Sequence, residues 1–330
     1  MRLPKFEYME PKTLREAVRA LASDPKGTVV LAGGTDLLVH MKHRLIQPKR
    51  VINLKGVPRL AYVSQGKDGV KIGPLTTLHD LAASAAIQEN YPALVKAALE
   101  VGAYAHQVMG TVAGNLCQAN RCRFYNQSAF WRSARPPCYK VGGNICYVVH
   151  ARPAGVRKSG ECHSAYSGDL APVLVALDAQ VRLLGPDGER SIPLKKLYTQ
   201  NGKKPLALRK GEMVKEILIP PPSGKTVYLK WRYREALEFP IVSLALSMEK
   251  GKDGRITKSK IVFSGIGTGP VETVEAEKGM RGESVDEGLI EKVSVQASKG
   301  VSPMRTSTIS PAYKRKMAGI LLKQALQQLM

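Results

Sequence analysis

Five cysteines lie close together in the middle of the chain, and its 330 residues contain no others. They are Cys117, Cys122, Cys138, Cys146 and Cys162. Cysteines clustered in a protein without secretory features indicate metal or redox chemistry rather than a disulfide framework. Four thiolates are the number that a [4Fe–4S] cluster needs, since each of its irons takes one cysteine. A cluster of this kind is the chemistry that these residues suggest first.

The spacing of the cysteines favours an iron–sulfur cluster over zinc. Zinc sites usually pair their cysteines two to four residues apart. Here 15 residues lie between the second and third cysteines, 7 between the third and fourth, and 15 between the fourth and fifth. A long loop wrapped around one cluster fits these gaps, so we expect the ligands to be Cys122, Cys138, Cys146 and Cys162. Cys117 is then the spare thiol, while a zinc site and a set of buried free thiols remain the alternatives.

Two glycine-rich segments have the composition of anion-binding loops. Residues 32–37 read Ala-Gly-Gly-Thr-Asp-Leu after a short apolar run, and residues 110–116 read Gly-Thr-Val-Ala-Gly-Asn-Leu. Glycine lets backbone N–H groups turn toward an anion. Neither segment is a Rossmann or P-loop motif, so each alone is also typical of an ordinary tight turn. Two such loops in one chain can grip a pyrophosphate from two sides.

Helices and strands alternate around these loops. A capping box at residues 13–16 predicts the start of a helix. The other expected helices begin near residue 77 or cover residues 92–105, 169–177 and 311–329. The expected strands cover residues 28–31, 51–54, 70–73, 180–184, 228–234, 241–248 and 260–264. Three prolines at residues 220–222 are typical of a linker between two domains.

Composition and charge restrict the class of protein. The net charge of +23 would suit a nucleic-acid binder, but the sequence has no helix-turn-helix or zinc-finger spacing. We therefore interpret the charge as a basic surface that faces acidic partner subunits or solvent. No apolar run approaches the ~18 residues of a membrane-spanning helix, and the N-terminus has no apolar signal core. We expect no nucleic-acid partner, no membrane span and a cytoplasmic location.

Several short motifs occur in an order that resembles one family of redox proteins. They occupy residues 31–38, 72–78, 110–116, 167–172 and 176–179. In this order they resemble the FAD-binding medium subunit of the molybdenum hydroxylase (xanthine oxidase) family, and residues 313–318 are similar to that family's C-terminal domain. The resemblance implies an α+β fold. A two-lobed FAD-binding domain of the vanillyl-alcohol-oxidase (PCMH) type would cover residues 1–222, and a smaller C-terminal α+β domain would cover residues 223–330.

The resemblance also assigns the FAD site. The two glycine loops would hold the FAD diphosphate, and Asp169 would bind a sugar hydroxyl or the adenine side. Lys230 would lie near the flavin ring, where a cation stabilises reduced flavin, although its residue type alone also fits an exposed strand lysine. Many family members have glycine where this chain has Ala113. The predicted FAD-binding residues are Leu31, Ala32, Gly33, Gly34, Thr35, Asp36, Leu37, Thr111, Val112, Ala113, Gly114, Asn115, Gln118, Asp169 and Lys230.

The segment between Asn115 and Asp169 narrows the resemblance. All five cysteines lie in these 54 positions, a segment that is far shorter in most of the family. Residues 116–127 and 160–169 are similar to the two ends of an insert in one branch, the β-subunits of 4-hydroxybenzoyl-CoA reductases. That branch carries a [4Fe–4S] cluster beside FAD, so we expect an iron–sulfur insert at residues 116–166. A longer basic stretch at residues 152–160 departs from the branch.

The insert is strongly basic. Its net charge from position 121 to 162 is +7, from eight basic residues and Glu161. Cations beside an anionic cluster raise its potential and steer an acidic donor toward it, which suggests a ferredoxin-like electron donor. A solvated charged loop is the alternative. The basic residues are Arg121, Arg123, Arg132, Arg135, Lys140, Arg152, Arg157 and Lys158.

The function that the resemblance implies is electron transfer, with no catalytic residue on this chain. Electrons would pass between the [4Fe–4S] cluster, FAD and [2Fe–2S] clusters on a small partner subunit. A large molybdopterin-binding subunit would reductively dehydroxylate 4-hydroxybenzoyl-CoA to benzoyl-CoA, in a dimer of heterotrimers. One alternative is the FAD subunit of an oxidising hydroxylase or dehydrogenase of the aldehyde, CO or purine type. The other is a zinc-stabilised basic binding module.

Overall fold

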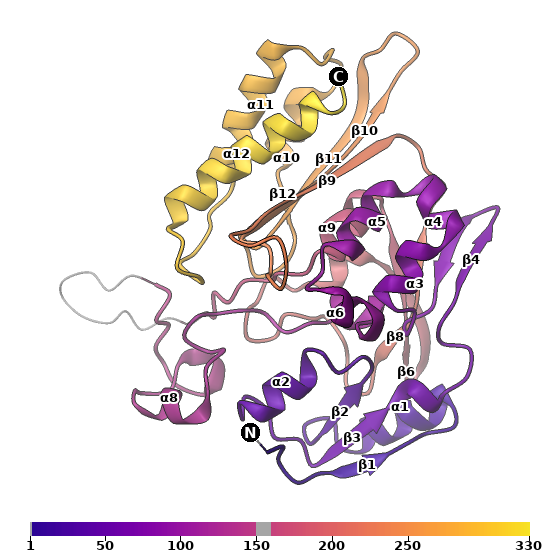
Figure 1. Cartoon of the computed structure of the whole chain (residues 1–330), viewed down its shortest axis with the longest axis vertical. Coiled ribbons are helices and arrows are strands. Elements are labelled where there is room, and N and C mark those ends of the chain that lie inside the picture. Colours follow the sequence, from indigo (N-terminus) through magenta and orange to yellow (C-terminus); the bar gives the residue numbers. More distant parts are fainter. Residues whose placement is uncertain (1, 150–159) are drawn as a thin grey trace.

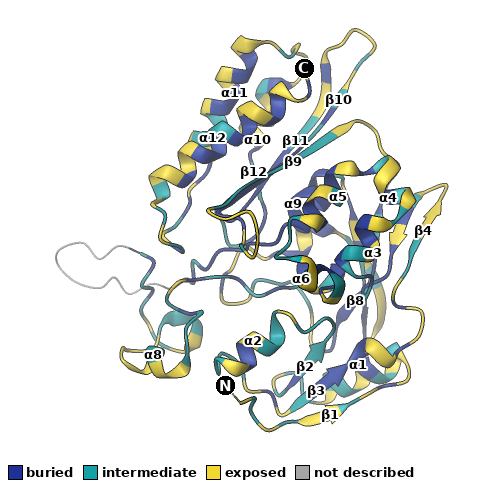
Figure 2. Ribbon diagram, in the orientation of Figure 1, coloured by how far each residue is buried: buried dark blue, intermediate teal, exposed yellow. Residues whose placement is uncertain are grey.

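The computed structural model describes residues 2–149 and 160–330, which form three sheets with their helices (Figure 1). Three basic residues of the insert, Arg152, Arg157 and Lys158, lie outside the described residues. Helix α9 (Leu170–Ala176) lies between the second and third sheets and is buried along its whole length (Figure 2). It follows Asp169 directly, so the most deeply packed helix begins at one of the predicted FAD-binding residues.

The first lobe is a small parallel sheet in the order β1-β3-β2, with β1 at Glu7–Met9, β3 at Arg50–Asn53 and β2 at Thr28–Leu31. Helix α1 (Leu14–Ser23) packs against it and starts at the expected capping box. Thr13 accepts from the Glu16 amide at 3.1 Å, while the Glu16 carboxylate reaches back to the amide of Lys12 at 2.8 Å. The chain leaves β2 through the first glycine loop and enters α2 (Leu37–Lys42).

The second lobe is an antiparallel sheet in the order β4-β5-β8-β6-β7. Its strands are Val63–Gly66, Gly69–Ile72, Met213–Ile219, Gln180–Gly185 and Gly188–Pro193. Its helices are α3 (Leu78–Ala83), α4 (Ala85–Asn90), α5 (Pro92–Leu99), α6 (Tyr104–Met109) and α7 (Val112–Leu116). One apolar core holds α9 together with residues of this sheet and of the third sheet.

The C-terminal unit is an antiparallel sheet in the order β12-β11-β10-β9. Its strands are Val271–Glu272, Ile256–Ser264, Val242–Lys250 and Lys225–Trp231. Helices α10 (Val274–Met280), α11 (Glu287–Gly300) and α12 (Pro311–Gln327) cover one face, and α9 contacts the strands from the other side (Figure 1). The chain therefore leaves the second sheet at Ile219 and enters the third at Lys225, on either side of the three prolines.

The cysteine insert is a lobe with little regular structure beside α2 (Figure 1). It contains the short helix α8 (Ala129–Ser133) and a 3-10 turn at Tyr139–Val141; further 3-10 turns lie outside it at Leu54–Gly56 and Leu194–Leu197. An antiparallel bridge between Arg121 and Ala165 ties its two ends together. No helix in the described ranges is long and apolar enough to cross a membrane.

Three of the predicted elements were wrong in their bounds, and one of them is the strand expected at residues 260–264, which begins at Ile256. The helix expected at residues 92–105 is divided into α5 and α6, because Gly102 lies between them with φ +58° and breaks the helical path. The strand expected at residues 228–234 starts three residues earlier and ends at Trp231. Helices α2, α7, α8, α10 and α11 were not expected.

Candidate functional site

A cavity of about 500 Å³ lies where the two glycine loops meet. Most of the predicted FAD-binding residues line it: Ala32, Gly33, Gly34, Thr35, Asp36, Leu37, Thr111, Gly114, Asn115, Gln118 and Asp169. Four of the predicted residues, Leu31, Val112, Ala113 and Lys230, are not part of its wall. The structure thus gathers two loops that are far apart in the sequence around one space.

The two glycine loops touch through their backbones. A Cβ atom on Gly33 would come within 2.0 Å of the carbonyl oxygen of Met109, so no larger residue fits there. Gly34 has φ +79°, which a side chain would strain. The amide of Leu78 donates to the carbonyl of Gly110 at 2.9 Å and holds the second loop from behind. Glycine is therefore required at Gly33 because there is no space for a side chain, and at Gly34 because of its positive φ.

The second loop is held by its own polar side chains. Thr111 caps α7 by accepting from the amide of Gly114 at 3.2 Å. The side-chain oxygen of Asn115 accepts from the amide of Leu170 at 3.3 Å, which fixes the loop to the start of α9. Both contacts orient the loop toward the cavity that Thr111 and Asn115 line.

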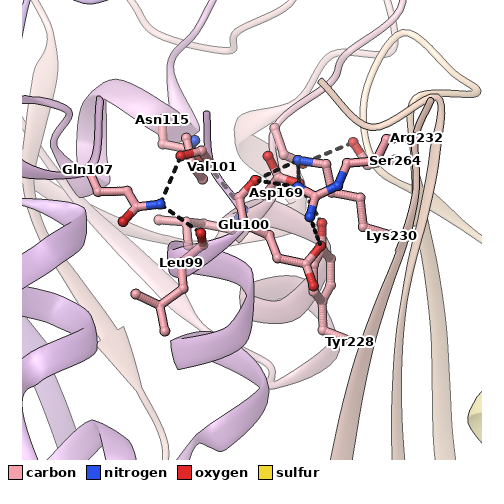
Figure 3. Close-up of polar contacts among 12 residues, drawn as sticks. Leu99, Glu100, Val101, Gln107, Asn115, Asp169, Tyr228, Lys230, Arg232 and Ser264 are labelled. Carbon is pink, nitrogen blue, oxygen red and sulfur yellow. Dashed lines mark hydrogen bonds and ion pairs between the residues drawn. The ribbon is translucent and has the colours of Figure 1, made fainter. Parts of the chain in front are cut away.

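Asp169 and Lys230 form a buried ion pair beside the cavity (Figure 3). Their charged atoms lie 3.0 Å apart, and their side chains are 3% and 0% exposed. Tyr228 donates to the same carboxylate at 2.5 Å, and the Lys230 ammonium donates to the carbonyl of Glu100 at 2.7 Å. Burial raises the pKa of Asp169, while Lys230 and Tyr228 oppose this by stabilising the carboxylate. Lys230 therefore lies behind Asp169 rather than in the cavity wall.

Part of the cavity wall was missed by sequence reasoning. It includes His40 on α2, His106 on α6, and the C-terminal unit's residues Leu237 to Phe239, which lie between β9 and β10. The amide of Leu237 donates to the carbonyl of Gly102 at 3.0 Å, and this contact brings the two units together. No motif marks these residues, because their proximity depends on how distant elements pack.

The residues present fit FAD. The wall combines a backbone-lined glycine cradle with hydroxyl and amide side chains suited to a diphosphate and a ribose. The side-chain nitrogen of Gln118 is buried and has no hydrogen-bond partner within the described parts of the chain. An unpaired buried donor is costly, so a ligand that accepts from it would be stabilising.

The four predicted cluster ligands share a second, smaller cavity. Cys122, Cys138, Cys146 and Cys162 all line it, whereas Cys117 lines the first cavity. Among residues 2–149 and 160–330, no group of three or more His, Cys, Asp or Glu side chains is placed to hold a single metal ion. Burial raises the pKa of Cys117 to about 12, so this thiol stays protonated at neutral pH.

The comparisons with known proteins agree over both domains. Residues 4–222 match the FAD binding domain in molybdopterin dehydrogenase, and residues 228–329 match the CO dehydrogenase flavoprotein C-terminal domain. The glyceraldehyde dehydrogenase medium chain of Sulfolobus acidocaldarius is 26% identical over 98% of each chain. The aldehyde oxidoreductase FAD-binding subunit PaoB of Escherichia coli is 32% identical over 76% of this chain and 80% of its own.

Solved structures have the same fold. A carbon monoxide dehydrogenase structure from Hydrogenophaga pseudoflava superposes with a TM-score of 0.81 at 22% identity, covering 99% of this chain and 98% of its own. Quinoline 2-oxidoreductase from Pseudomonas putida 86 superposes with a TM-score of 0.79 at 19% identity over the same shares of both chains. The chain belongs to the FAD-binding medium subunits of the molybdenum hydroxylase family.

Proposed function

We propose that this chain transfers electrons between FAD and the iron–sulfur clusters of partner subunits in a molybdenum dehydrogenase complex. The observation that carries the proposal is the cavity between the two glycine loops, whose wall fits FAD. Bound FAD supplies redox chemistry that takes or gives one or two electrons. The chain itself contributes a rigid cradle at Gly33 and Thr111 and the buried Asp169 at the cavity wall.

The partners in this proposal are a large molybdopterin-binding subunit and a small [2Fe–2S] subunit. They are proposed to assemble with this chain as a dimer of heterotrimers in the cytoplasm, with the FAD domain ending near residue 222. Support comes from relatives whose names describe medium chains or FAD-binding subunits of dehydrogenases. The substrate would then bind the large subunit, and the specificity of the complex would not lie in this chain.

The names of the relatives favour electron flow from molybdenum to FAD. They are named as enzymes that oxidise glyceraldehyde, carbon monoxide, xanthine or nicotinate. A complex of this type would oxidise its substrate at molybdenum and deliver the electrons to FAD. An aldehyde, CO or purine is therefore the first class of substrate to test.

A [4Fe–4S] cluster in the insert is a further part of the proposal. It is supported by four cysteines, from well-separated positions, that line one small cavity. A [4Fe–4S] cluster binds each thiolate to a different iron, so its ligands stand farther apart than around a single zinc ion. The residues that would hold it are Cys122, Cys138, Cys146 and Cys162. Such a cluster supplies one-electron transfer.

The cysteine cavity also favours a second candidate function. A 4-hydroxybenzoyl-CoA reductase would run electrons inward, from a ferredoxin-like donor through the insert to FAD and then to molybdenum. The observation in favour is the insert, whose described part carries Arg121, Arg123, Arg132, Arg135 and Lys140 around the four cysteines. Basic side chains near an anionic cluster suit an acidic donor protein.

One experiment separates the two directions. The complex is purified anaerobically and assayed for oxidation of aldehydes, CO and purines, and separately for reduction of 4-hydroxybenzoyl-CoA by reduced ferredoxin. Oxidation alone supports the dehydrogenase, and reduction alone supports the second candidate. A protein that holds zinc and no flavin contradicts both and leaves a zinc-stabilised binding module.

A further inference from the structure

We call the first cavity, between the two glycine loops, the flavin cavity. The second, lined by Cys122, Cys138, Cys146 and Cys162, is the cysteine cavity, and the two have one lining residue in common. Tyr125 lines both cavities, and it also belongs to the small apolar cluster that contains Cys122 and Cys146. The insert also contacts the body of the protein elsewhere, although α8 is largely exposed (Figure 2): the amide of Arg123 donates to the carbonyl of Thr306 at 2.9 Å, and the Lys140 ammonium donates to the carbonyl of Gly202 at 3.1 Å. Contacts at the root of the insert, where it meets the first glycine loop, therefore help to set how far the two cavities lie from each other.

An ion pair fixes the root of the insert to the first glycine loop. Arg121, which directly precedes Cys122, forms this ion pair with Asp36. The other carboxylate oxygen of Asp36 accepts from the amide of Ala119 at 3.1 Å. The Arg121 guanidinium also stacks on the ring of Phe239, with 4.2 Å between the guanidinium carbon and the ring centre. One aspartate of the flavin loop thus holds two positions at the start of the insert.

His40 extends this contact to a proposed cluster ligand. Its Nε2 atom lies 3.0 Å from Nη1 of Arg121 and 3.3 Å from Nδ2 of Asn126. The Asn126 side-chain oxygen accepts from the amide of Cys122 at 2.8 Å, which orients the amide nitrogen toward His40. Arginine can only donate, so Nε2 of His40 is the acceptor and the imidazole is neutral. Burial, the largest influence, lowers the pKa of His40 and so favours this neutral form.

We propose that Asp36, His40 and Arg121 are positioning residues that hold the cysteine insert at a fixed separation from the flavin cavity. The proposal rests on the [4Fe–4S] cluster of the proposed function. The step they serve moves one electron between the cluster and FAD, with no bond made or broken. Because electron tunnelling falls exponentially with distance, a small shift of the insert slows this step. The three side chains themselves exchange no electron.

The test measures electron transfer inside the purified complex. The complex is reduced rapidly under anaerobic conditions by a reduced ferredoxin-type donor, which delivers electrons at the insert cluster, and the appearance of reduced flavin is followed by its absorbance. Arg121→Met removes the ion pair, and Arg123→Met is the matched control because the exposed Arg123 side chain contacts Phe124 of the insert and the carbonyl of Ser307 in the C-terminal unit, away from the first glycine loop. Arg121→Met should slow the step about tenfold or more, as expected for a misplaced redox partner, while Arg123→Met should not.

A second pair of variants tests the same role even if Arg121→Met does not fold. His40→Leu removes the acceptor, whereas His40→Gln supplies a carbonyl oxygen in a similar place. We expect His40→Leu to slow the transfer and His40→Gln to restore most of it, with flavin and iron contents unchanged. If Arg121→Met loses iron, the comparison of His40→Leu with His40→Gln tests the positioning role instead.

The outcomes separate the two proposals. A wild-type complex that contains flavin but no iron contradicts the cluster, and the positioning role with it. A wild-type complex with both cofactors, together with wild-type transfer rates in Arg121→Met and His40→Leu, contradicts the positioning role alone.

Discussion

Asp169 and Lys230 form a buried ion pair that joins the two domains, because Asp169 precedes α9 and Lys230 lies on β9. Only Asp169 lines the flavin cavity. The resemblance assigned Lys230 to the flavin ring, and that role stays a prediction. The arrangement gives Lys230 a second task, which is to neutralise a carboxylate that burial would otherwise disfavour.

Replacing Lys230 should destabilise the protein strongly. Lys230→Met leaves Asp169 buried without its cation, and removing one partner of such a pair costs about 3–5 kcal/mol. Lys258→Met is a suitable control, because Lys258 is 52% exposed and its surface pair with Asp178 contributes about 1 kcal/mol or less. Urea unfolding measures both. Addition of Asp169→Asn to Lys230→Met should recover part of the loss, and equal stability of the two single variants would contradict the account.

Gly33→Ala should abolish FAD binding. The added methyl group would overlap the carbonyl oxygen of Met109, so the two glycine loops would have to separate. Gly56→Ala is the matched control, since a Cβ atom there meets nothing within 4 Å. The flavin-to-protein absorbance ratio of the purified variants is the measurement. Full flavin content in Gly33→Ala would show that the cavity is not the FAD site.

The cysteines should divide into two classes. Substitution by serine at Cys122, Cys138, Cys146 or Cys162 should lower the iron content sharply, because each position would lose a thiolate ligand. Cys117→Ser should keep its iron, because Cys117 lines the flavin cavity instead. Iron and acid-labile sulfide analysis after anaerobic purification distinguishes the classes. Loss of iron from Cys117→Ser, with iron retained in Cys162→Ser, would show that Cys117 is the fourth ligand and Cys162 the spare thiol.

The stability of the C-terminal unit should depend on pH through Lys314. Its ammonium is buried and donates to the carbonyl of Gly265 at 3.1 Å, and burial lowers the pKa of Lys314 from 10.5 to about 8. Between these values Lys314 binds more protons in the unfolded chain than in the native one, so its contribution to stability should rise from pH 8 to pH 10.5, by on the order of 3 kcal/mol. Urea midpoints across this range should therefore rise in the wild type relative to those of Lys314→Met. Parallel plots of urea midpoint against pH for the two proteins would contradict the lowered pKa of Lys314.

Local sequence was enough to predict the parts that short motifs encode. The glycine loops, the capping box at Thr13 and the start of α9 depend on backbone requirements within a few residues. The cysteines were recognisable by type and spacing; Cys117 lines a different cavity from the other four, and its role as the spare thiol stays a prediction.

Other parts depend on contacts between distant residues and carry no local signal. The wall at Leu237 to Phe239 exists because the C-terminal unit docks on Gly102. The burial of Lys230 follows from its pairing with Asp169, whereas sequence alone also fitted an exposed strand lysine. The break after α5 depends on one glycine with positive φ inside an otherwise helical pattern.

The most direct measurement is the cofactor content of the anaerobically purified complex, expressed per copy of this chain. We expect one FAD per copy of this chain. We also expect about four irons and an equal amount of sulfide from the insert, in addition to the iron of any partner subunit. Comparing the complex with its Cys122→Ser form isolates the iron that belongs to this chain. Flavin with no difference in iron between the two forms, or zinc in place of iron, would contradict the account.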